Sequence, residues 1–211
     1  MNTTTRPNDS MVLSYLALRK AVGAIGILLP FVLVAGHFFE AGLKIEASIS
    51  AYYWTNMHDV FVGSLCAIAV FLASYHGPEK ADDIAGDLAC VSALGVALVP
   101  TTPVTANGYE YGPVHLAFAA AFFLVLSYFC LVLFRKTDPT RPPTPQKIQR
   151  NKVYTACGYT ILASIALVAL LKLTVFGREL AAYSPVFWLE SIAILAFGLS
   201  WFTKGEAILK D

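Results

Sequence analysis

A small set of ionisable and hydroxyl side chains lies at the ends of apolar segments, where these groups could act on a membrane-bound substrate. Its members are three histidines, two carboxylates and two serines: His37, His58, His115, Asp59, Glu190, Ser48 and Ser50. Three imidazole nitrogens and an open fourth position suit Zn²⁺, which lowers the pKa of a bound water. Asp59 or Glu190 would then orient a ligand or act as a base, and Ser48 or Ser50 would bind a substrate carbonyl. The chemistry would be hydrolysis of an ester or amide.

The same residues also have a purely structural interpretation. No two of the candidate ligands are spaced three or four residues apart, and no His-Glu-x-x-His, P-loop or dinucleotide motif is present. Tyrosine and tryptophan gather around them, as in the aromatic belt at a membrane interface, where histidine need not bind a metal: Tyr52, Tyr53, Trp54, Tyr109, Tyr111, Tyr183 and Trp188. Both interpretations stay open, because the sequence does not decide whether these residues converge.

A second polar group precedes and enters the third apolar segment. Asp83 and Asp87 are four residues apart, so they share one face of a helix, with Asp82 beside them. A carboxylate inside a membrane is by default a functional candidate, for example in a proton relay. The alternative is that Lys20 or Lys152, expected at the same level, simply neutralises it.

The elements that must position these side chains are six apolar helices. Hydrophobic residues make up 57% of the 211 residues, charged residues 14%, and the mean hydropathy is +0.63, well away from the roughly 25% charged residues of soluble proteins. We expect an all-α, polytopic membrane protein in which residues 1–211 form one domain. The expected helices are 21–39, 60–75, 84–99, 114–134, 153–171 and 186–202, of which the second and third are short for a span of ~20 residues.

Basic residues predict the orientation of this six-transmembrane-helix bundle. Of the 15 Lys and Arg residues, all but Lys44, Lys172 and Arg178 fall in the termini and in alternate loops. The positive-inside rule therefore predicts that the N and C termini are cytoplasmic, in a multi-pass protein of the cell membrane. This segregation argues against nucleic acid as a partner and for membrane lipids.

Two further patterns concern individual segments. Residues 135–152 combine four prolines with six basic residues, which predicts a solvated, partly extended cytoplasmic linker. Ala85, Ala89, Ala93 and Ala97 recur every fourth residue and predict a small-residue ridge that lets a neighbouring helix approach closely.

Residues 47–134 resemble a known type of membrane protein. The features are Ser48-Ile49-Ser50, then His58-Asp59-Val60-Phe61 opening a helix, and His115 near the start of the fourth helix. These are similar to the six-helix proteins of the Frag1/DRAM/Sfk1 type and the bacterial DUF998 class, in which a Ser-x-Ser loop follows the first helix. Ser48, Ser50 and His115 match, whereas His58 stands where the family has a basic residue such as Arg. The resemblance implies a compact bundle with a role in lipid remodelling or distribution.

Three functional hypotheses follow. The first is a lipid-handling or structural protein with a polar vestibule at the outer face. The second is a metal-dependent, membrane-embedded hydrolase or acyl-remodelling enzyme that acts on lipid of the outer leaflet, with zinc as cofactor. The third is a small proton-coupled transporter, which would need a polar path between Asp87 and Glu190. The sequence does not decide whether the protein is an enzyme, or its oligomeric state.

Overall fold

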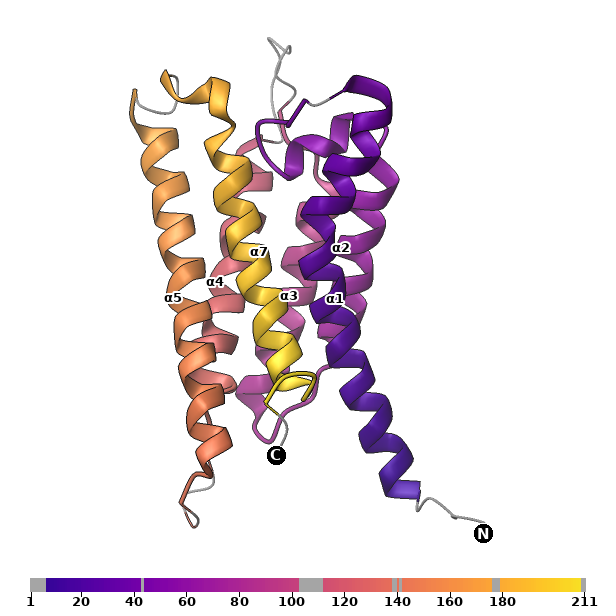
Figure 1. Ribbon diagram of the computed structural model, residues 1–211, viewed down its shortest axis with the longest axis vertical. Coiled ribbons are helices and arrows are strands. Elements are labelled where there is room, and N and C mark those ends of the chain that lie inside the picture. Colours follow the sequence, from indigo (N-terminus) through magenta and orange to yellow (C-terminus); the bar gives the residue numbers. More distant parts are fainter. Residues whose placement is uncertain are drawn as a thin grey trace.

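In the computed structural model, the described residues are 7–42, 44–102, 112–137, 140, 142–175 and 179–209, with side chains from Tyr15 onward. All regular structure within them is helical (Figure 1). The long helices are α1 (Pro7–Ala41), α2 (His58–Ala73), α3 (Lys80–Leu98), α4 (Gly112–Tyr128), α5 (Pro145–Leu173) and α7 (Pro185–Lys204). A π-helical turn, η2 (Phe129–Leu133), continues α4, and two 3₁₀ helices, η1 (Ser50–Trp54) and η3 (Ala181–Tyr183), lie in connections.

Each of the six expected segments lies mainly within one of these helices, which confirms the all-helical class. Four helical stretches are long and apolar enough to cross a membrane: Tyr15–Ala41, Gly112–Leu133, Pro145–Leu173 and Pro185–Lys204. The helix α2 is apolar but shorter. The helix α3 carries Asp82, Asp83 and Asp87 in its first half. The described part of the chain is thus a helical bundle with four potential membrane spans.

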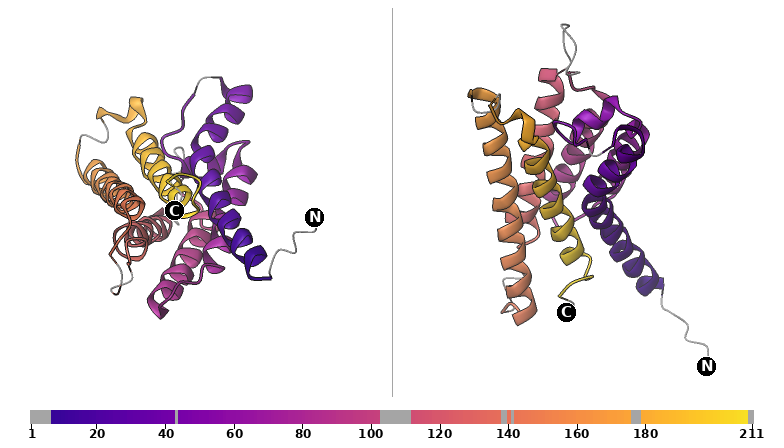
Figure 2. Two further views of the ribbon diagram at one scale, coloured as in Figure 1. Left: turned by 60° about the horizontal axis from the view of Figure 1, so that its bottom comes forward. Right: turned by 45° about the horizontal axis from the view of Figure 1, so that its top comes forward.

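The two ends of the bundle differ. The helix α1 begins and α7 ends at the same end, which we call the terminal end (Figure 1). Residues 44–57, which we call the cap loop, fold across the opposite end and contain η1 (Figures 1 and 2). The helix α7 lies between α1 and α5 and packs against both (Figure 2).

Glycines allow α1 and α7 to approach closely. A Cβ atom added to Gly198 would lie 2.6 Å from Ile27 Cγ1 and 2.8 Å from the carbonyl oxygen of Gly23. A Cβ atom added to Gly23 would lie 2.9 Å from the carbonyl oxygen of Gly198. Small residues at such crossings bring helix backbones together, which is how membrane helices gain packing energy.

The alanine ridge of α3 is confirmed. Ala85, Ala89, Ala93 and Ala97 are all buried, and α3 packs between α2 and α4. The close approach extends to α2, because a Cβ atom on the neighbouring Gly86 would lie 2.8 Å from the carbonyl oxygen of Leu72.

Aromatic side chains fill the terminal half of the core. The Trp201 ring lies 5.3 Å from that of Phe134, 5.5 Å from Tyr75 and 5.9 Å from Phe129, centre to centre. The Tyr154 ring is 5.3 Å from Phe134. These contacts join α7, the loop after α2, η2 and α5 in one cluster, so the helix ends around it are held in fixed relation.

Part of the expected linker is helical instead of extended. The helix α5 begins at Pro145, so residues 145–152 belong to it rather than to a solvated linker. Thr144 is the N-cap, and its Oγ1 accepts a hydrogen bond of 3.1 Å from the amide of Lys147. Proline is favourable at the first position of a helix because its missing N–H would be unsatisfied there. The last of the four prolines thus starts a helix. Pro139 and Arg141 lie outside the described residues.

Candidate functional site: the cap loop and the cavities beside it

Glu190 anchors the cap loop to α7. Its Oε2 accepts a hydrogen bond of 2.7 Å from the amide of Ile49, and the amide of Ser50 also interacts with the carboxylate. These amides open η1, where no preceding turn can satisfy them, so the carboxylate acts as a cap from another helix. Ser48 Oγ accepts a hydrogen bond of 3.0 Å from the amide of Ala51. Glu190 therefore faces the interior, and its hydrogen-bond partners there are backbone amides.

Three more hydrogen bonds tie the cap loop to the rest of this end of the bundle. Two reach the start of α7 and one reaches the segment after α3: Phe187 N to Ala47 O at 3.1 Å, Ser184 Oγ to Ile45 O at 3.2 Å, and Trp54 Nε1 to Thr101 O at 2.9 Å. The cap loop is thus hydrogen-bonded to Ser184, Phe187 and Glu190 at the start of α7. These bonds hold it across this end of the bundle.

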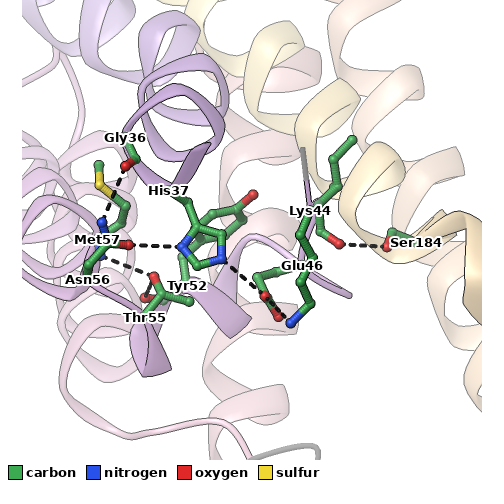
Figure 3. A network of polar contacts seen from close by, with 10 residues as sticks. Gly36, His37, Lys44, Glu46, Tyr52, Thr55, Asn56, Met57 and Ser184 are labelled. Atoms are coloured by element: carbon green, nitrogen blue, oxygen red, sulfur yellow. Dashed lines mark hydrogen bonds and ion pairs between the residues drawn. The ribbon is translucent and has the colours of Figure 1, made fainter. Parts of the chain in front are cut away.

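His37 links the end of α1 to both halves of the cap loop (Figure 3). Its Nδ1 lies 2.9 Å from Asn56 Oδ1 and its Nε2 lies 3.4 Å from Glu46 Oε1. Lys44 Nζ is 2.9 Å from the same Glu46 oxygen. The ring of His37 meets that of the buried Tyr52 edge-on, at 5.6 Å. Burial raises the pKa of Tyr52 above its ordinary value, so the phenol stays neutral.

The other two histidines have different surroundings. His58 Nδ1 lies 3.0 Å from Asp59 Oδ1, whose side chain is fully exposed, and its ring lies 4.5 Å from that of Tyr53. His115 is buried, and its Nδ1 donates a hydrogen bond of 2.7 Å to the carbonyl oxygen of Val99. That bond ties the start of α4 to the end of α3.

Among the described residues, the three histidines therefore share no partner. In the part of the chain that the structure describes, no group of three or more His, Cys, Asp or Glu side chains is placed to hold a metal ion. Neither Ser48 nor Ser50 is hydrogen-bonded to a histidine among these residues. The zinc site stays a prediction for which the described geometry supplies no ligand set. Ser48 and Glu190 have clear structural roles in capping η1.

An apolar cavity of about 290 Å³ opens between α4, α5 and α7. Most of its walls are aliphatic or aromatic, from Leu116, Ala120, Phe123, Val168 and Leu189 among others. Of the described residues that line it, Lys172 and Glu190 are the charged ones. Sequence reasoning chose Glu190 but missed Lys172, which was counted only as a topology signal.

A second cavity adjoins the first. It measures about 420 Å³ and lies between the cap loop, the end of α5 and the start of α7. Ala47, Thr174 and Ser184 line it, and it shares Lys172 and Leu173 with the apolar cavity. Lys172 therefore stands where a polar opening meets an apolar interior. Sites of this form suit a ligand with a charged head and a hydrocarbon tail.

The polar group near the terminal end is organised around Asp82, which sequence reasoning noted only as a neighbour. Its side chain is 1% exposed and lies 2.7 Å from Lys136 Nζ, which is also 3.2 Å from Glu79 Oε2. Asp82 Oδ2 accepts a hydrogen bond of 3.2 Å from the Glu79 amide, in a capping box that starts α3. Burial acts to lower the pKa of Lys136, but the two carboxylates outweigh it and raise that pKa above its ordinary value.

Asp83 and Asp87 lie at the surface of α3. Asp83 Oδ1 is 3.3 Å from His76 Nδ1, and Asp87 is exposed. The expected partners Lys20 and Lys152 form no ion pair with either in the described residues, where Lys136 neutralises Asp82 instead. Asp87 is near the start of α3 and Glu190 near the start of α7, so they lie toward opposite ends of the bundle.

Comparisons of this chain with protein-family models, with curated proteins and with solved structures found no match. The resemblance of residues 47–134 to Frag1/DRAM/Sfk1-type and DUF998 proteins therefore stays a prediction.

Proposed function

We propose that this protein is a six-span integral membrane protein of the cell membrane that holds a lipid, its acyl chain in the cavity between α4, α5 and α7. The observation that carries the proposal is the lining of that cavity. Apolar side chains form most of the wall, and Lys172 and Glu190 stand together toward the cap-loop end. A hydrocarbon chain gains from leaving water, whereas an anionic head would stay near Lys172 and the more polar second cavity.

The cap loop would limit access to the lipid head. It lies at the end of the bundle where the last turn of α5 carries Lys172, and Ala47 contributes to the polar cavity. Because Glu190 holds the amides of Ile49 and Ser50, the same residue lines the cavity and anchors the loop. The position of the loop and the occupancy of the cavity would then be coupled.

The orientation rests on charge. Basic residues such as Arg19, Lys136, Lys147 and Lys204 gather in the segments that the fold brings to the terminal end. By the positive-inside rule, this supports the proposal that the terminal end faces the cytoplasm. The cap loop and the cavity mouth would face outward. The hydrolase and transporter hypotheses stay predictions, since no described arrangement favours either.

The test fills the cavity without changing the helix. Ala120 lines the cavity on α4, whereas Ala117 on the same helix is exposed and does not line it. We expect Ala120→Phe to retain several-fold less co-purifying lipid than the native protein, measured by native mass spectrometry and by lipid extraction. Ala117→Phe, the matched control, should retain the native amount.

Equal retention by the two variants, with both proteins monodisperse, would contradict the proposal. A loss in both would also contradict it, because the bound lipid would then depend on the surface of α4 and not on the cavity.

A further inference from the structure

Four basic side chains from three helices meet at the terminal end. They are Arg19 on α1, Lys147 and Arg150 on α5, and Lys204 on α7, and we call them the basic cluster. Arg19 Nη1 lies 3.5 Å from the carbonyl oxygen of Lys204. Lys147 Nζ donates a hydrogen bond of 2.9 Å to the carbonyl oxygen of Phe134, and Lys204 Nζ lies 5.3 Å from the centre of the Phe134 ring. The charges of Arg19, Lys147 and Arg150 all act on Lys204.

Among the described residues, carboxylates pair with only part of this positive charge. Arg150 Nη1 lies 3.9 Å from Glu206 Oε1, and the nearby Asp82 is already bound by Lys136 at 2.7 Å. In the part of the chain that the structure describes, neither Arg19 nor Lys204 forms an ion pair with a carboxylate. Arg19 and Lys204 therefore give the cluster an excess of positive charge over its described carboxylate partners.

Burial makes this excess costly. The side chain of Arg150 is 9% exposed, and Arg19 and Lys204 are partly buried. Arg19 Nε is buried and has no hydrogen-bond partner among the described residues. Like charges repel more strongly where water is excluded, and an anion that accepts hydrogen bonds from several of them offsets that cost.

The level of the cluster in the bundle points to the kind of anion. Lys204 is the last residue of the apolar helix α7, and Arg19 lies near the terminal end of the apolar stretch of α1. The ends of apolar spans meet the headgroup region of a bilayer, where phosphates lie. The aromatic core of Phe134 and Trp201 lies directly beside the cluster.

We infer that the basic cluster binds the phosphate of an anionic phospholipid. This site is independent of the acyl-chain cavity, which lies toward the opposite end of the bundle. Arginine would supply two parallel hydrogen bonds to phosphate oxygens and lysine a single point charge.

The experiment compares charge-neutral variants of the full-length protein in nanodiscs and by native mass spectrometry. The probes are phosphatidylglycerol, phosphatidylcholine and inorganic phosphate. We expect Arg19→Gln and Lys204→Gln each to lower retention of phosphatidylglycerol about fivefold, as fits the attraction of one basic residue to an anionic surface. Lys152→Gln removes an exposed charge from the same end and should leave retention unchanged.

Charge-preserving variants separate binding from folding. Arg19→Lys and Lys204→Arg should retain more phosphatidylglycerol than the glutamine variants. If the glutamine variants retain as much phosphatidylglycerol as Lys152→Gln does, the inference is overturned. Arg19 and Lys204 would then only set the orientation in the membrane. Equal retention of phosphatidylcholine, or displacement of the lipid by millimolar inorganic phosphate, would also overturn it. Ala120→Phe should leave this binding intact, so the two proposals fail separately.

Discussion

Among single residues, Glu190 is the one whose side chain holds the cap loop to α7. A carboxylate in an apolar helix is costly unless it is paired, and here it accepts backbone hydrogen bonds from η1. The same side chain lines the apolar cavity. One residue therefore connects the cap loop to the lipid site that we propose.

Removing that acceptor should loosen the cap loop without unfolding the bundle. Hydrogen bonds to a charged group contribute about 1.5–3 kcal/mol, so in Glu190→Leu we expect amide exchange at Ile49 and Ser50 to accelerate by about tenfold to a hundredfold. Glu190→Gln keeps a neutral acceptor and should show a smaller acceleration. Hydrogen–deuterium exchange followed by mass spectrometry measures both.

The exposed Glu40 provides the control, since Glu40→Leu also replaces a carboxylate with an apolar side chain near this end. Exchange in the cap loop that is as slow in Glu190→Leu as in Glu40→Leu would show that the carboxylate does not hold the loop.

At the scale of elements, the crossing of α1 and α7 depends on two glycines. Gly23 and Gly198 face each other so closely that a Cβ atom on either would lie within 2.9 Å of the other's carbonyl oxygen. The contact fixes α7 against α1 and so sets where Glu190 and Lys204 lie at its two ends. Both proposed lipid sites depend on this crossing.

A methyl group at Gly198 should therefore destabilise the bundle. We expect Gly198→Ala to lower the free energy of unfolding by about 1–3 kcal/mol, as is usual for overpacking, with a lower midpoint in thermal unfolding of the detergent-solubilised protein. The control is Gly63→Ala on α2, where the added Cβ has no neighbour within 4 Å. Because alanine is the better helix former, that variant should be neutral or slightly more stable. Similar midpoints for the two variants would refute the close crossing.

At the scale of the whole molecule, the topology that we propose assigns the terminal end to the cytoplasm and the cap loop to the outside. In intact cells, a membrane-impermeant maleimide should label Ala47→Cys in the cap loop. It should label Gln146→Cys, at the start of α5, only after permeabilisation. Both positions are exposed. The native protein is the control, because Cys66, Cys90, Cys130 and Cys157 are free but buried or partly buried. Labelling of Gln146→Cys in intact cells would contradict this orientation and would put the terminal end outside.

Sequence reasoning was most accurate for the positions of the helices. The six apolar segments correspond to α1, α2, α3, α4, α5 and α7, and the alanine ridge of α3 is buried as predicted. It was least accurate for the segments that connect the helices and for the partners of polar side chains. Residues 145–152 were expected in an extended linker, but Thr144 and Pro145 start a helix there. Asp82 was treated as a neighbour of Asp83 and Asp87, yet it is the buried carboxylate of the three.

The bundle of apolar helices could be predicted from the chain alone. It follows from a local property, namely the hydropathy of each segment. Only the tertiary structure decided which polar groups meet. It gave His37, His58 and His115 separate partners, paired Asp82 with Lys136, and set Lys172 beside Glu190 in one cavity. The physical reason is that such contacts depend on the rotation and crossing of helices. Close packing of side chains sets the rotation and crossing of the helices, and the hydropathy of a segment does not predict either.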